Sequence, residues 1–118
     1  MIATLLITLL VAASPVEKTP EQPTLQCNIG PAAKQFGGNE WLVYACADGH
    51  SVVVTAGSPN PAAPFFFIIT PDGNGGIELH GEGTGAKSAT KSAYDSLGIM
   101  SSSGLAALFQ EAMRANGR

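Results

Sequence analysis

The apolar residues between positions 41 and 82 come in four short runs, and the turn residues between these runs restrict the possible folds. The runs cover residues 41–46, 51–56, 65–70 and 77–82. Asp48-Gly49 separates the first two runs and residues 71–76 separate the last two, and both stretches are typical of hairpin turns. The prolines of residues 57–64 exclude a helix or a central strand there. The pattern therefore predicts a four-stranded antiparallel meander.

After residue 85 the spacing of apolar residues changes from a strand period to a helix period. Small or apolar residues at Ala89, Ala93 and Leu97 fall on one side of a helix. A second stripe follows at Leu105, Leu108, Phe109, Ala112 and Met113. We predict an α+β domain of the order ββββαα, in which the two C-terminal helices pack on one face of the sheet.

The amino-terminal residues resemble a cleavable secretion signal in composition. Residues 2–13 are apolar and uncharged, and they are too few to span a membrane. We expect cleavage after Ala13, a Pro-rich linker over residues 14–26, and a single α+β domain over residues 27–118. A buried helix or strand is the alternative for the apolar segment. The predicted location is secreted or periplasmic, with no transmembrane segment after cleavage.

Cys27 and Cys46 are the two cysteines of the chain. In an oxidising compartment an even number of cysteines predicts a disulfide. A reactive or metal-binding thiol is the alternative, but neither cysteine has a Cys-x-x-Cys partner or an adjacent histidine. We therefore predict that a disulfide holds the residues after the linker against the end of the first apolar run.

Three of the four apolar runs lack the alternation expected of a strand with one buried face. In such strands a second set of apolar side chains points away from the helices, and it comprises Leu42, Tyr44, Val53, Phe66 and Ile68. Two short helices cover one face of a small sheet only, so the second face needs another cover. The candidates are residues 27–39, a second copy of the chain, or a bound protein or small apolar ligand.

The charge of the chain is unevenly distributed. The formal net charge is -3, which gives no basic surface for nucleic acid. Residues 35–86 contain acidic residues and no lysine or arginine, whereas residues 87–118 contain more basic residues than acidic ones. An acidic sheet beside mildly basic helices favours a cationic partner, and a simple solvated surface is the alternative.

No motif predicts a catalytic residue or a cofactor. Glu78, His80 and Glu82 alternate on the fourth run, so they are candidate ligands for a metal such as zinc, or else a polar solvent-facing edge. Residues 81–88 are rich in glycine, but Ala86 separates Gly85 from Lys87 and breaks the spacing of a phosphate-binding loop. We favour a binding or protein-interaction domain of the cell envelope over a small metal-dependent or hydrolytic enzyme centred on His80.

Overall fold

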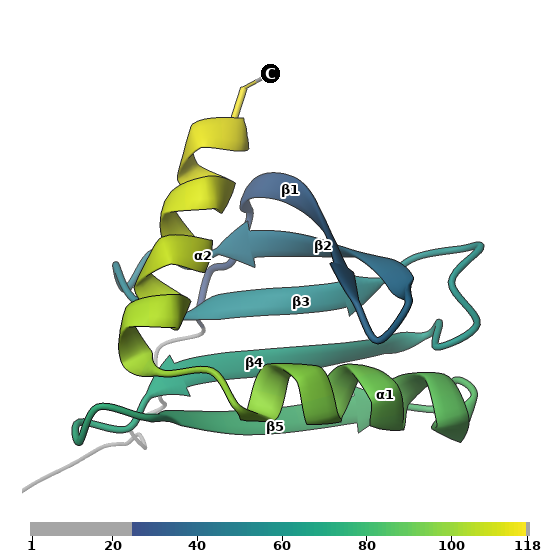
Figure 1. Ribbon diagram of the computed structural model, residues 1–118. Helices are drawn as coiled ribbons and strands as arrows, with labels where there is room; N and C mark the ends of the chain where they lie inside the picture. The colour runs from purple at the N-terminus through teal and green to yellow at the C-terminus, as the bar shows by residue number, and fades with distance from the viewer. Residues whose placement is uncertain (1–24, 118) are drawn as a thin grey trace, which may run out of the picture.

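The four apolar runs form four strands of one antiparallel sheet, and a fifth strand precedes them (Figure 1). The computed structural model describes residues 25–117. Its strands are β1 (Ile29–Phe36), β2 (Asn39–Ala45), β3 (Val52–Ala56), β4 (Phe65–Pro71) and β5 (Ile77–Gly83). The helices that follow are α1 (Lys87–Gly98) and α2 (Ser102–Ala115). The predicted α+β class is confirmed, but the meander has five strands in the order β1-β2-β3-β4-β5, not four.

The predicted signal at residues 1–13 and the first part of the predicted linker, residues 14–24, lie outside the described residues. Within the described part of the chain, neither α1 nor α2 has the length and hydropathy needed to cross a membrane.

The strand missing from the prediction, β1, lies in the segment that was a candidate cover for the second sheet face. Gly37 and Gly38 have φ values of 60° and 86°, a left-handed conformation that glycine adopts without strain, and they connect β1 to β2. The register pairs Lys34 with Trp41 and Phe36 with Asn39. This segment extends the sheet at its edge, so residues 27–39 do not cover the second face.

The core lies between the sheet and the two helices. The sheet contributes Trp41, Val43, Val52, Val54, Phe67 and Ile69, each at most 1% exposed. The helices contribute Ala93, Leu97, Leu105, Leu108 and Ala112 from the side that faces the sheet. Full burial of each large aliphatic side chain stabilises the fold by roughly 1.5–3 kcal/mol. These contacts hold both helices on one face, as predicted.

The Pro-rich loop between β3 and β4 holds the start of α1. Ala86 has no side-chain cap, but its backbone N–H donates to the carbonyl oxygen of Pro61 at 3.0 Å. Asn60 is buried and ties the loop to the sheet, because its Nδ2 donates to the Glu40 carbonyl oxygen at 2.8 Å. The loop is therefore a fixed part of the fold that places α1 next to β5.

Candidate functional site

The sheet face opposite the helices carries the predicted second set of apolar side chains. We call Leu42, Tyr44, Val53, Phe66 and Ile68 the open face. They come from β2, β3 and β4, and the strand register places them in adjacent rows: Tyr44 beside Val53, and Val53 beside Ile68. A second row runs from Leu42 through Thr55 to Phe66.

The side chains of the open face are half-buried. In residues 25–117, α1 runs beside β5 and α2 packs mainly against β1 and β2, and both helices pack on the core side (Figure 1). Part of each open-face side chain therefore remains accessible in the described structure. A contiguous apolar surface of this kind is typical of an interaction site.

Acidic side chains border the open face. Glu40 lies on the same side of β2 as Leu42. On β5, Glu82 lies beside Phe66 of β4, and Glu78 lies beside Thr70 of β4. We call Glu40, Glu78 and Glu82 the acidic margin. Among the described residues, Lys34 on β1 pairs with Glu111 of α2 at 2.8 Å, and the other lysine and arginine side chains are carried by α1 and α2. The described face thus combines apolar side chains with negative charge.

The candidate metal ligands Glu78, His80 and Glu82 form a row along the outer strand β5. The Nε2 atom of His80 lies 3.7 Å from Oε2 of Glu82, and their side chains are 71% and 65% exposed. In residues 25–117 there is no group of three or more His, Cys, Asp or Glu side chains placed to hold a metal ion. The geometry of this row is that of a solvated polar edge.

A hollow of about 410 Å³ lies at one end of the open face. Its lining includes Phe66 from β4, Glu82 and Gly83 from β5, and Pro64 from the Pro-rich loop. Phe66 and Glu82 are direct cross-strand neighbours. An aromatic ring and an accessible carboxylate therefore line the same depression, which sequence reasoning did not find.

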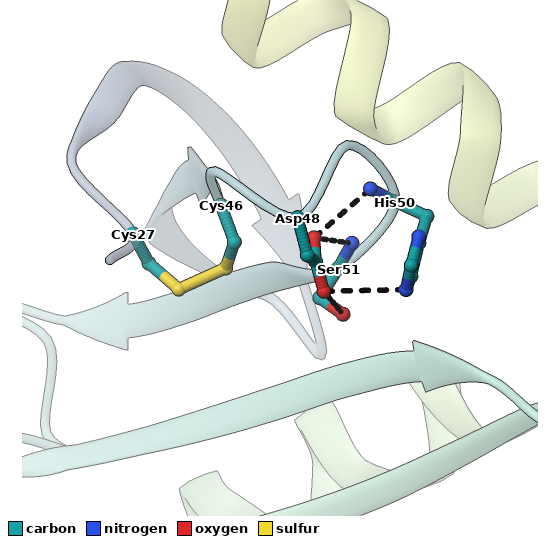
Figure 2. Close-up of a disulfide and its surroundings, with 5 residues drawn as sticks. All are labelled: Cys27, Cys46, Asp48, His50 and Ser51. Atoms are coloured by element: carbon teal, nitrogen blue, oxygen red, sulfur yellow. Dashed lines mark hydrogen bonds and ion pairs between the residues drawn. A yellow bond between two sulfur atoms is a disulfide. The ribbon is translucent and has the colours of Figure 1, made fainter. Parts of the chain in front are cut away.

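The predicted disulfide joins Cys27 and Cys46, with an S–S distance of 2.04 Å (Figure 2). Cys46 is fully buried at the end of β2, and the neighbouring Ala47 N–H donates to the Gln26 carbonyl oxygen at 2.7 Å. Both cysteines are therefore oxidised in a structural link. The alternative of a reactive or metal-binding thiol does not fit this pairing.

Asp48, His50 and Ser51 meet in the loop that connects β2 to β3 (Figure 2). The Asp48 carboxylate accepts hydrogen bonds from the Ser51 hydroxyl and from the backbone N–H groups of His50 and Ser51, and it lies 3.3 Å from His50 Nε2. A nucleophilic serine would need its hydroxyl bonded to histidine and open to substrate. Ser51 is fully buried and bonded to the carboxylate, so this cluster stabilises the loop.

The glycine-rich stretch at residues 81–88 owes its glycines to close packing. A Cβ atom on Gly81 would lie 2.8 Å from the Phe65 ring, and one on Gly85 would overlap the carbonyl oxygen of Ala62. The glycines let β5 and the start of α1 approach the aromatic rings and the Pro-rich loop. This packing explains the composition without a phosphate ligand.

Comparisons of the chain with protein-family models, with curated proteins and with solved structures found no match.

Proposed function

We propose that this protein is an exported, disulfide-bonded interaction domain of the cell envelope that binds a protein partner through its open face. The observation that supports this proposal most is the continuous apolar surface of Leu42, Tyr44, Val53, Phe66 and Ile68, which lies on the side of the sheet opposite α1 and α2. Aromatic side chains such as Tyr44 and Phe66 are frequent anchors of protein interfaces.

Two features support the proposed export. The Cys27–Cys46 disulfide fits an oxidising compartment. Residues 2–13 have the composition of the apolar part of a secretion signal. We expect the protein recovered from the periplasm or the medium of an expressing bacterium to start at Ser14. Intact mass spectrometry should give the mass of that cleaved chain. Recovery of only the uncleaved chain from the cytosol would contradict the proposed export.

Binding of Nile red, a neutral dye that fluoresces on apolar surfaces, tests the open face. We expect the oxidised, folded protein to enhance Nile red fluorescence. Ile68→Gln should abolish most of this enhancement, because it places a polar side chain in the centre of the apolar rows. Ala107→Gln is the matched control, since Ala107 is exposed on α2 away from the open face.

Circular dichroism should show that both variants keep the fold. An absence of dye binding by the folded protein, or an equal loss in both variants, would contradict an accessible apolar face.

A further inference from the structure

We propose that the element recognised by the open face is a basic polypeptide segment in which two arginine or lysine residues four positions apart flank apolar residues, and that the hollow beside Phe66 and Glu82 holds one of its cationic side chains. This inference rests on the proposed interaction function and adds the chemistry of the partner.

Charge complementarity is the first argument. The acidic margin places Glu40, Glu78 and Glu82 around the open face, and the described lysine and arginine side chains lie on the core side of β1 or on the helices. A partner with basic residues would gain attraction on approach and in the complex. A second copy of the chain packed face to face would instead bring two sets of carboxylates together. The charge therefore favours a basic partner over a symmetric dimer.

The second argument comes from the geometry of the hollow. Phe66 and Glu82 are cross-strand neighbours, and such pairs have Cβ atoms about 4.5–5.5 Å apart. The Glu82 side chain is 65% exposed, so its carboxylate is accessible to a ligand. A guanidinium group stacks on an aromatic ring and pairs with a carboxylate at the same time. Phe66 and Glu82 together offer both contacts to one arginine side chain.

The third argument is the spacing of the acidic margin. Glu78 and Glu82 point to the same side of β5 four residues apart, which corresponds to about 13 Å along a strand. An extended peptide has the same rise per residue. Cationic side chains four residues apart in such a peptide would therefore match both carboxylates. The apolar residue midway between them points to the same side and would contact Phe66 and Ile68.

The probe for the experiment is a fluorescein-labelled decapeptide with two arginines four residues apart and leucine or phenylalanine between them. The matched control peptide carries citrulline, a neutral isostere, in place of both arginines. Fluorescence anisotropy measures the affinity of each for the oxidised protein. We expect the arginine peptide to bind more tightly, with an affinity that falls as salt rises.

Protein variants locate the contact. Glu82→Gln should weaken binding of the arginine peptide by about fivefold and leave the citrulline peptide unchanged. Asp95→Asn is the matched control, because it removes one negative charge from the exposed side of α1, where Asp95 pairs with Lys91. Ile68→Gln should weaken the binding of both peptides, since the apolar residues of both contact the apolar rows of the open face.

Several outcomes would overturn the inference. Equal affinity for the arginine and citrulline peptides, or no binding of either by a protein that binds Nile red, would reject a basic partner while the open face remains an interaction site. An equal effect of Asp95→Asn and Glu82→Gln would show dependence on net charge only. A failure of Nile red to bind would instead reject the proposed function itself.

Discussion

At the scale of single residues, Asp48 organises the loop between β2 and β3. Its carboxylate accepts three hydrogen bonds from His50 and Ser51, and its side chain is 24% exposed. Partial burial alone would raise the pKa of Asp48. The hydrogen bonds from the Ser51 hydroxyl and the two backbone N–H groups, together with the nearby His50, outweigh burial and hold the pKa of Asp48 below its ordinary value.

A lowered pKa makes the stability of the fold depend on pH. The unfolded chain binds a proton to Asp48 more readily than the folded protein does, so the carboxylate stabilises the fold above its ordinary pKa of 3.8. This contribution declines as the pH falls through that value and then through the lower pKa of the folded state.

We therefore predict that Asp48→Asn lowers the free energy of unfolding by about 1–2 kcal/mol at neutral pH, because buried Ser51 loses its charged acceptor. The difference in the free energy of unfolding between the native protein and the variant should shrink towards pH 3. Urea unfolding at neutral pH and at pH 3 measures this difference. A difference that stays constant with pH would show that the charge of Asp48 contributes nothing.

At the scale of elements, the start of α1 depends on close contact with the Pro-rich loop. Gly85 and Ala62 approach so closely that a Cβ atom at residue 85 would overlap the Ala62 carbonyl group. The backbone of the loop cannot move freely, because Asn60 binds β2 and the Pro61 carbonyl binds Ala86. The loop, β5 and α1 therefore form one packed unit.

We predict that Gly85→Ala lowers the free energy of unfolding by about 3 kcal/mol or more, since the added methyl group meets backbone atoms. Gly57→Ala is the control in the same region: a Cβ atom there meets nothing within 4 Å, so the change should stay within about 0.5 kcal/mol. Thermal unfolding of both variants measures the effect. Equal stability of the two would contradict the packing described for Gly85.

The sequence predicts β2 to β5 well because each strand carries its own apolar run and its own turn residues. β1 lacks such a signal: Gly30, Pro31, Ala32 and Ala33 have low strand propensity, and the register shifts between Ile29 and Ala32. Pairing with β2 supplies what the local sequence lacks. The one local signal was Gly37-Gly38, a two-residue turn that precedes a strand.

The open face was predictable for a similar reason. Alternation along a strand assigns Leu42, Tyr44 and Val53 to one side as soon as the strands are known. The hollow was not predictable, because it depends on the register that places Glu82 beside Phe66 and on the path of the loop that brings Pro64 there. The buried hydrogen bond from Ser51 to Asp48 likewise depends on the exact course of the loop.

At the scale of the whole molecule, the described charges are distributed unevenly between the two sides of the sheet. The open face is bordered by the acidic margin, and the lysines of α1 lie on the other side of the sheet. A ligand that approaches the open face therefore meets carboxylates, whereas the helix side presents charges of both signs, and this difference favours docking of a cationic partner on the open face.

We predict that the oxidised protein is a monomer at physiological salt, because face-to-face association would oppose the two acidic margins. Light scattering after size exclusion should give the mass of one chain. A dimer that Phe66→Glu dissociates would contradict this expectation and would assign the open face to self-association.

The Cys27–Cys46 link also determines how the molecule responds to mechanical load. β1 is an edge strand, and tension on its amino-terminal end would ordinarily peel it from β2 one hydrogen bond at a time. Because Cys27 precedes β1 and is covalently bound to the end of β2, tension applied before residue 27 passes directly to Cys46. The tension then continues along the chain from Cys46 towards β3, so β1 and β2, which lie between the two cysteines, are spared from unzipping.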